Sequence, residues 1–253
     1  MLVAAYLVEN ESIPSPQASR PFRGGLTGSL KTGVFENVWH VDVRSLYPSI
    51  IIAEGLQPRV DSLGVYRTYL TDLREFRLAA KDAAQAAEGS ERDHYDALQG
   101  SFKILINSFY GYAGFGMGTF NDYDLAEEVT ARGREILHRM LDFLEGDGAT
   151  VIEMDTDGIY FVPPSGVVDT EVMQARVQSV LPEGIEVDLD TTYQAMLAYK
   201  AKNYVLLDHE GEVSITGAAL KSRGLEPFQR RYMEELLTAL IRRETPRARG
   251  LMA

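Results

Sequence analysis

The sequence of 253 residues contains no cysteine, which excludes disulfide bonds and thiolate metal sites. Its four histidines lie far apart along the chain, so no zinc site is indicated. No apolar run reaches the roughly 18 residues that a membrane-spanning helix needs. The first residues also lack the basic segment with which a signal peptide begins. These absences favour a cytoplasmic protein that does not enter a membrane.

Charge is unbalanced, because acidic residues outnumber basic ones and give a formal net charge of −12. Such a balance by itself argues against a nucleic-acid partner. The distribution is uneven, however, because residues 221–253 contain eight basic and four acidic residues. The net charge of the whole chain therefore does not identify the partner.

Hydrophobic periodicity and turn residues predict an α+β fold in which an antiparallel sheet is backed by helices. Residues 10–33 are rich in proline, serine and glycine and are expected to be irregular. The helices expected over 68–88 and 91–111 form a helical hairpin. Strands are expected at 36–43 and in hairpins over 150–164 and 203–217, and further helices at 123–145, 172–181 and 226–243.

Two stretches place carboxylates at the ends of expected core strands. Asp42 lies in VDVRSLYPSIII, where a buried charge is unfavourable without a partner or a metal. Asp155 and Asp157 lie in EMDTDG, which taken alone is more typical of an ordinary hairpin turn. If the two elements are neighbours in one sheet, the three carboxylates converge and repel one another unless cations bind. Hard cations such as Mg²⁺ prefer oxygen ligands and suit phosphoryl transfer.

The expected helical hairpin carries cations that suit a phosphate-bearing substrate. Arg77 and Lys81 are four residues apart and share one helix face, although a solvated face is the ordinary interpretation of either one. Lys103 is more informative, because it lies in the apolar and aromatic segment FKILINSFYGYAGF, which offers rings for a base to stack on.

These motifs together resemble those of the family B DNA polymerases. DVRSLYPSII resembles the family's D-x-x-S-L-Y-P-S-I, KILINSFYG its K-x-x-x-N-S-x-Y-G, and DTDG its D-T-D-S. AKNY at 201–204 resembles the primer-strand motif K-K-x-Y, and RGLEPFQRR at 223–231 the segment that follows it. FRGG at 22–25 resembles the Y-x-G-G link between exonuclease and polymerase. The motifs follow the family's order over nearly the whole chain.

The resemblance implies a set of site residues. Asp42 and Asp157 would bind two catalytic Mg²⁺ ions, or Mn²⁺ in their place, with the Val43 carbonyl as a further ligand. Asp155 would be a nearby and less essential catalytic acid. Tyr47 would lie under the deoxyribose and exclude a 2′-hydroxyl. The other nucleotide-binding residues would be Ser45, Leu46, Arg77, Lys81, Lys103, Asn107 and Tyr110, and the DNA-binding residues would be Gly24, Gly25, Gly111, Lys202, Tyr204, Lys221 and Arg223.

The resemblance also implies a polymerase palm with a short helical-hairpin insertion, the fingers. The expected organisation is a lead-in with the FRGG link over 1–35, palm over 36–67 and 113–225, fingers over 68–112, and a thumb remnant with a basic tail over 226–253. Few residues precede FRGG and few follow RGLEP, so the exonuclease domain and most of the thumb are expected to be absent.

Three positions depart from the family's motifs. Gly158 stands in place of the usual serine after D-T-D, which removes no metal ligand. Ala201 replaces the first lysine of K-K-x-Y and so removes a phosphate contact, and Phe22 replaces the tyrosine of Y-x-G-G.

The function implied is that of a template-dependent DNA polymerase core, which adds dNTPs to the 3′ end of a primer without proofreading, in the cytoplasm or on the nucleoid. Primer–template DNA and dNTPs would be its partners. A protein partner or a second copy would supply a thumb by docking on the apolar face of helix 226–243, unless that face packs on the palm. Two alternatives stay open: a non-catalytic polymerase-like subunit that binds DNA or scaffolds a replication or repair complex, and a fragment of a larger enzyme. Primer extension with Mg²⁺ distinguishes the enzyme from the non-catalytic subunit.

Overall fold

The computed structural model describes residues 2–222 and 224–252, and the chain divides into two compact units. The first, which we call the helical unit, comprises residues 1–24, 45–133 and 183–185. The second, the sheet unit, comprises residues 25–44, 134–182 and 186–253. Within the described residues, no helix combines the length and the apolar character that a membrane span requires.

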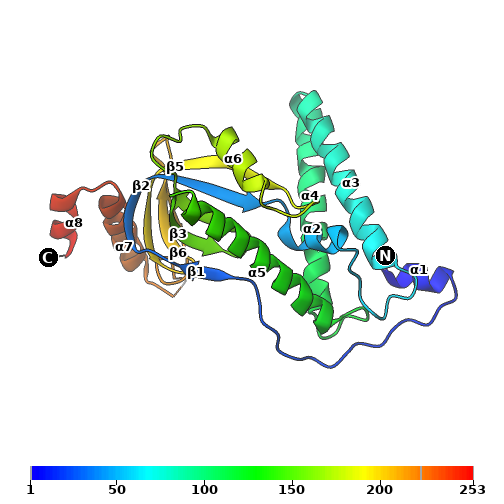
Figure 1. Cartoon of the computed structure of the whole chain (residues 1–253). Helices are drawn as coiled ribbons and strands as arrows, with labels where there is room; N and C mark the ends of the chain where they lie inside the picture. Colours follow the sequence, from blue (N-terminus) through cyan, green and yellow to red (C-terminus); the bar gives the residue numbers. More distant parts are fainter. Residues whose placement is uncertain (1, 223, 253) are drawn as a thin grey trace. The chain divides into compact units, whose positions relative to one another are not determined.

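The sheet unit is built on one antiparallel sheet (Figure 1). Over the described part of the chain, seven strands pair in the order β1-β3-β4-β2-β5-β6-β7. The strands are β1 (Thr27–Ser29), β2 (Gly33–Val43), β3 (Thr150–Asp155), β4 (Gly158–Val162), β5 (Val187–Lys200), β6 (Asn203–Leu207) and β7 (Val213–Thr216). The expected strand at 36–43 and both expected hairpins are confirmed. Strand β1 falls in the lead-in that was expected to be irregular.

Strand β2 lies at the centre of the sheet and carries much of the core. It pairs with β4 on one side and with β5 on the other, and both pairings are antiparallel. Val38, Val41 and Val43 of β2 are fully buried. Such burial removes a large apolar area from water, at roughly 25 cal/mol per Å². The register of this well-fixed strand determines where its C-terminal end presents Asp42.

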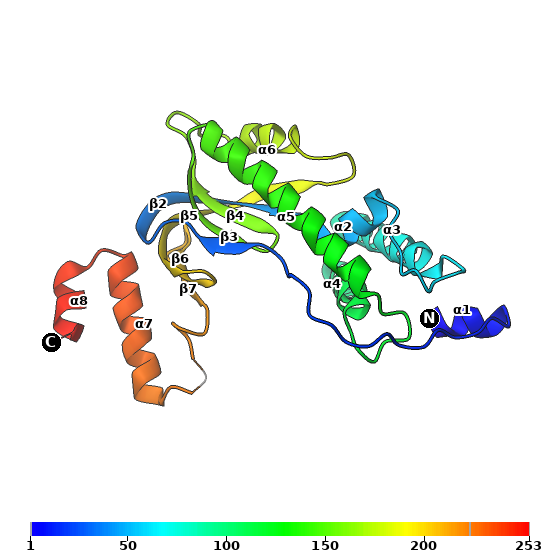
Figure 2. The same ribbon diagram turned by 60° about the horizontal axis from the view of Figure 1, so that its bottom comes forward.

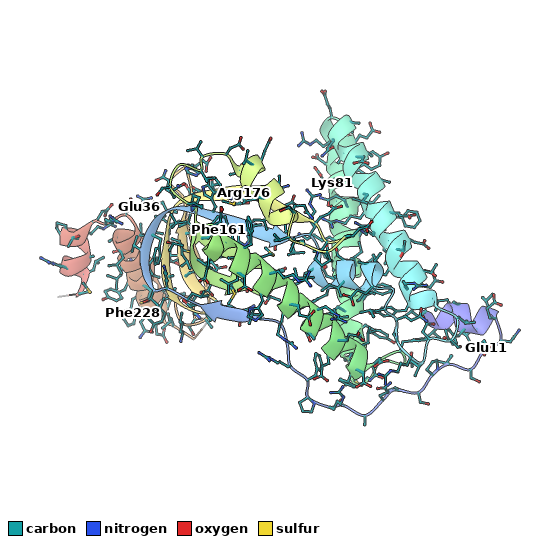
Figure 3. The ribbon with its side chains drawn as sticks, in the orientation of Figure 1. Glu11, Glu36, Lys81, Phe161, Arg176 and Phe228 are labelled. Atoms are coloured by element: carbon teal, nitrogen blue, oxygen red, sulfur yellow. The ribbon has the colours of Figure 1, made fainter. Side chains whose placement is uncertain are left out.

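Helices back the sheet. From residue 134 onward, α5 (Tyr123–Gly146) belongs to the sheet unit, and its Leu137, Met140 and Leu144 are fully buried. Helix α6 (Thr170–Gln178) begins at its N-cap Asp169, whose side chain accepts two backbone N–H bonds. Arg176 of α6, labelled in Figure 3, pairs with Asp147 just after α5.

The end of the chain forms α7 (Pro227–Ile241) and α8 (Thr245–Met252), which follow the last strand, β7 (Figure 2). Leu237 and Ile241 of α7 pack into one buried cluster with Val205 and Leu207 of β6. The predicted helix at 226–243 is therefore confirmed, and its C-terminal half contacts the sheet. Phe228 near its start is 66% exposed and remains outside that cluster.

The helical unit contains α1 (Leu2–Val8), α2 (Leu46–Ala53), α3 (Val65–Ala86), α4 (Gly89–Ala113) and the first part of α5. Helices α3 and α4 run side by side as a hairpin (Figure 1), as the alanine-rich pattern predicts. Tyr66 at the start of α3 is fully buried and donates its hydroxyl to the Phe109 carbonyl of α4. Asp122 caps α5, because its carboxylate accepts the N–H groups of Asp124 and Leu125.

Candidate active site

Three aspartates lie at adjoining strand ends in the sheet unit. Asp42 of β2 is paired in register with Gly158 at the start of β4, and Gly158 is paired on its other side with Asp155 at the end of β3. Asp157 lies in the turn between β3 and β4, where its carbonyl accepts the Val43 N–H at 2.8 Å. The sheet register therefore makes the strands of the two motifs neighbours, which is the condition stated above for the three carboxylates to converge.

The turn between β3 and β4 has an unusual backbone. Thr156 has φ of 56°, a left-handed conformation that is rare for a β-branched residue. Its N–H is held by the Leu26 carbonyl at 2.9 Å, from the segment that leads into β1. Strand β1 continues this support, because Thr27 pairs with Asp155. The residues after FRGG thus fix the turn that presents Asp155 and Asp157.

The end of β2 is fixed by an ion pair on its other side. Arg44 donates to the Asp188 carboxylate of β5, with one N–O distance of 2.7 Å, and to the Glu186 carboxylate at 3.0 Å. These acids raise the pKa of the Arg44 guanidinium further above its ordinary range. The pairing anchors the backbone two residues beyond Asp42.

Asp155 lies in a network of polar side chains. Its carboxylate pairs with the Lys202 ammonium at 2.9 Å and accepts a longer bond of 3.4 Å from the Tyr204 hydroxyl. The Tyr204 hydroxyl in turn lies 3.3 Å from the Tyr160 hydroxyl. Burial raises the pKa of both tyrosines, so both hydroxyls stay protonated near neutral pH. Two of the predicted DNA-binding residues, Lys202 and Tyr204, thus contact a predicted catalytic acid.

Glu153, which the sequence reasoning did not select, lies beside this network. It is fully buried in β3, and its Oε1 accepts the Lys202 backbone N–H at 2.6 Å. Burial raises the pKa of its carboxyl, and the Lys202 N–H and the nearby Ser29 hydroxyl offset part of that rise. The two-residue spacing of Glu153 and Asp155 places both on one face of β3, and that spacing was the available signal.

Gly158 leaves room for a histidine. His40 stacks on Tyr160 with ring centroids 4.2 Å apart. A Cβ atom at position 158 would lie 2.5 Å from His40 Nε2 and 3.0 Å from the Val41 carbonyl oxygen, both too close for an undisturbed contact. A serine at this position would therefore require His40 to shift.

The donor set at these strand ends fits Mg²⁺. Among the described residues, no group of three histidine, cysteine or acidic side chains is placed closely enough to hold a metal ion on its own. The candidate ligands are two carboxylates, Asp42 and Asp157, and one backbone carbonyl, Val43, all of them hard oxygen donors. Mg²⁺ is usually held by one or two carboxylates together with substrate phosphates, so this set suits an ion that binds with its nucleotide.

The helical unit holds the residue predicted to select the sugar. The rings of Tyr47 in α2 and Tyr110 in α4 lie with centroids 4.2 Å apart. Tyr47 also lies over Gly133 in α5, where an added Cβ would be 3.1 Å from Tyr47 Cε1. The ring is thus enclosed by two helices, and Leu46 beside it is buried. The Tyr47 ring therefore has little freedom to move.

The predicted phosphate-binding residues lie on the hairpin of the same unit. Arg77 of α3 donates to the Ser45 hydroxyl at 3.3 Å, so two predicted nucleotide-binding residues meet. Lys81 of α3, labelled in Figure 3, and Lys103 and Asn107 of α4 are exposed. These side chains can reach a ligand without first being uncovered.

The remaining predicted DNA-binding residues are distributed over both units. Gly24 and Gly25 lie in the exposed segment before β1, Gly111 lies in α4, and Lys221 is exposed after β7. Arg223 lies outside the described residues.

Comparisons with known proteins identify the family of the chain. Residues 59–252 match the profile of DNA polymerase family B. The DNA polymerase of Thermococcus sp. (strain 9oN-7) is 28% identical over 92% of this chain, and the DNA polymerase alpha catalytic subunit of Oryza sativa subsp. japonica is 31% identical over 83%. These matches cover 35% and 15% of the two relatives, so the chain spans about a third of the length of the first and less of the second.

The fold is shared with a solved structure. The family B DNA polymerase from the hyperthermophilic archaeon Pyrobaculum calidifontis matches 97% of this chain with a TM-score of 0.67 at 24% identity, over 37% of its own chain. The predicted α+β class, an antiparallel sheet backed by helices, is thereby confirmed. Because the family profile covers well over half of its residues, the chain belongs to DNA polymerase family B.

Proposed function

We propose that the chain is a template-dependent DNA polymerase core, which joins a dNTP to the 3′ end of a primer and releases pyrophosphate. The observation that carries the proposal is the sheet register. The chain belongs to DNA polymerase family B, and its sheet register brings Asp42, Asp155 and Asp157 to adjoining strand ends. Lys202 is paired to Asp155 there. The primer 3′ oxygen attacks the α-phosphate, a new P–O bond forms, and the bond to the pyrophosphate leaving group breaks.

Asp42, Asp157 and the Val43 carbonyl are the residues that would hold Mg²⁺, with Mn²⁺ as a substitute. When bound, a pair of such ions supplies charge stabilisation at the attacking and the leaving oxygen. The protein's own part would be to hold in place the strand ends that carry the two carboxylates. The Val43–Asp157 backbone bond and the Arg44–Asp188 pair do this for the two strand ends.

Lys202 and Tyr204 are proposed to hold the primer terminus. Lys202 places its ammonium on the face that carries Asp155, where a backbone phosphate of the primer would find a cation. Tyr204 adds a hydroxyl donor in a buried, fixed position. Positioning of this kind lowers the barrier because the attacking oxygen is already near the phosphate when the nucleotide binds.

The helical unit is proposed to bind the nucleotide. Arg77, Lys81 and Lys103 would neutralise the triphosphate, and Ser45, Leu46, Asn107 and Tyr110 would shape the surroundings of the base and sugar. Tyr47, enclosed by Tyr110 and Gly133, would exclude a 2′-hydroxyl by steric clash. Gly24, Gly25, Gly111, Lys221 and Arg223 would contact DNA.

Two further features belong to the proposal. Synthesis would run without proofreading, because the carboxylates that the matched motifs supply, Asp42, Asp155 and Asp157, are all assigned to the polymerase reaction. A partner or a second copy would supply thumb contacts at the start of α7, because Phe228 there is largely exposed while the C-terminal half of the helix packs on the sheet. The expected domain boundaries, with palm over 36–67 and 113–225 and fingers over 68–112, belong to this proposal as well.

Single-nucleotide primer extension tests the proposed function. Wild-type protein is mixed with primer–template DNA, one dNTP and Mg²⁺, and is compared with Asp42→Asn and Asp157→Asn. We expect extension by the wild-type protein and loss of extension in both variants. A well-folded wild-type protein that binds the DNA but never extends it would instead identify a non-catalytic subunit.

A further inference from the structure

Glu153 presents a problem that the polymerase motifs do not explain. Its side chain is 0% exposed, and burial of an acidic group is unfavourable unless the group has partners. Oε1 accepts one backbone N–H, that of Lys202, at 2.6 Å. Oε2 is buried as well and makes no hydrogen bond of normal geometry with any described residue. A buried polar group retained under these conditions calls for a functional explanation.

The Lys202 N–H that Glu153 accepts belongs to a strained turn. Lys202 connects β5 to β6 with φ of 57°, a left-handed conformation that is uncommon for lysine. The opposite side of the turn is also closely packed, because a Cβ at Gly217 would lie 2.1 Å from the Lys202 carbonyl oxygen. The turn is therefore fixed from two sides, by an acceptor at its N–H and by close backbone packing at its C=O.

The turn determines where the Lys202 side chain goes. Its ammonium pairs with Asp155 at 2.9 Å and donates to the Thr156 hydroxyl at 3.1 Å. Both partners belong to the β3 end and the turn that follows it, and Glu153 lies in the same strand, two residues before Asp155. One short segment thus binds the backbone of Lys202 at one point and its side chain at two others.

We infer that Glu153 is a positioning residue, which holds the backbone of Lys202 so that the lysine ammonium stays beside Asp155 and Thr156. The inference rests on the proposed role of Lys202 at the primer terminus. Glu153 is buried and acts through Lys202, without touching DNA or nucleotide. Loss of its acceptor leaves the Lys202 N–H unpaired in a left-handed turn, which then relaxes and carries the ammonium away from the site.

A set of variants tests the inference in the full chain. Glu153→Gln keeps an acceptor oxygen at the same reach, Glu153→Asp keeps the charge but withdraws the acceptor, and Glu153→Leu removes both. The measurements are kcat and the KM for primer–template in single-nucleotide extension, together with the unfolding temperature. We expect the KM to rise about tenfold in Glu153→Leu and to rise in Glu153→Asp, but to stay within about threefold of wild type in Glu153→Gln.

A double-mutant cycle with Lys202→Ala separates positioning from general destabilisation. If Glu153 acts through the Lys202 side chain, Glu153→Leu adds little to the KM of Lys202→Ala. Asp169→Ala is the matched control, because it removes the N-cap of α6 in the same unit and lowers stability without touching the β5–β6 turn. We expect Asp169→Ala to lower the unfolding temperature and leave the KM for primer–template unchanged.

Three outcomes would overturn the inference. A raised KM in Lys202→Ala with a normal KM in both Glu153→Leu and Glu153→Asp would refute the role of Glu153 and leave the proposed function intact. Full additivity in the cycle would make Glu153 a general structural residue. A normal KM in Lys202→Ala would remove the proposed role of Lys202 and the inference with it. Should Glu153→Leu fail to fold, Glu153→Asp and Glu153→Gln still give the decisive comparison.

Discussion

Replacement of Gly158 by serine, the family's usual residue at this position, is expected to impair this protein. The new Cβ would lie 2.5 Å from His40 Nε2 and 3.0 Å from the Val41 carbonyl oxygen. Overpacking of this kind in a tightly packed region costs about 1–3 kcal/mol. For a domain of this size, each kcal/mol lowers the unfolding temperature by about 2–4 °C. The proposed polymerase activity should fall as well, because the His40 ring or the strand pair that places Asp42 opposite Gly158 has to shift.

A second variant, His40→Ala, tests whether the clash with the His40 ring causes this loss of stability. It removes the closer clash and leaves the contact with the Val41 carbonyl, so Gly158→Ser should be tolerated better in the His40→Ala background. We expect a coupling of about 0.5–3 kcal/mol in a cycle measured by thermal unfolding. Gly146→Ser is the control, because a Cβ there meets nothing within 4 Å. A Gly158→Ser protein as stable and active as wild type, or one that His40→Ala does not relieve, would refute the packing described for this strand pair.

Two further predictions concern the sugar and the DNA. Tyr47→Ala should lower the preference for dNTP over rNTP by about tenfold or more, and Gly133→Ala should lower it as well, since its Cβ would lie 3.1 Å from the Tyr47 ring. Unchanged ratios of kcat/KM for the two nucleotide types would reduce Tyr47 to a packing residue. Primer–template binding by the chain alone should be weak at about 150 mM salt, with short products, because the net charge is −12 and Ala201 replaces a lysine of the primer-strand motif. Tight binding by a monomer, with products of hundreds of nucleotides, would show that no partner is needed for thumb contacts.

Elements with strong local patterns could be predicted from the sequence. The alanine-rich segment gives the α3–α4 hairpin within a few residues at each end, because helix propensity and periodicity act locally. The turn residues Thr156 and Asp157 likewise mark the connection of β3 and β4. Asp42 and Asp155 could be assigned to neighbouring strands only because the motifs resembled those of a known family.

Strand β5 could not be predicted, although it is the longest in the described sheet. Its sequence, VDLDTTYQAMLAYK, mixes acidic and threonine residues with apolar ones, so its period is indistinct. Its place is set by distant partners, chiefly β2, which is about 150 residues earlier in the chain. Gln174 and Gln178 of α6 add to this by accepting the N–H groups of Leu189 and Val187. These interactions exist only in the folded chain.

Glu153 was missed for the same physical reason. In EMDTDG it looks like one more acid beside a turn. Its burial depends on the β5–β6 turn, and its hydrogen-bond partner Lys202 is 49 residues further along the chain. A sequence pattern can place Glu153 and Asp155 on one face of a strand, but it does not show what covers that face.

The most direct test of the account is single-nucleotide extension by Asp157→Asn and Asp155→Asn beside the wild-type protein, with unfolding temperature as the check on folding. Asp157 is exposed in its turn, so its replacement should leave stability near that of wild type. We expect Asp157→Asn to lower the extension rate by about 100-fold or more and Asp155→Asn to lower it less. Extension by a folded Asp157→Asn protein within a few-fold of the wild-type rate would contradict this expectation.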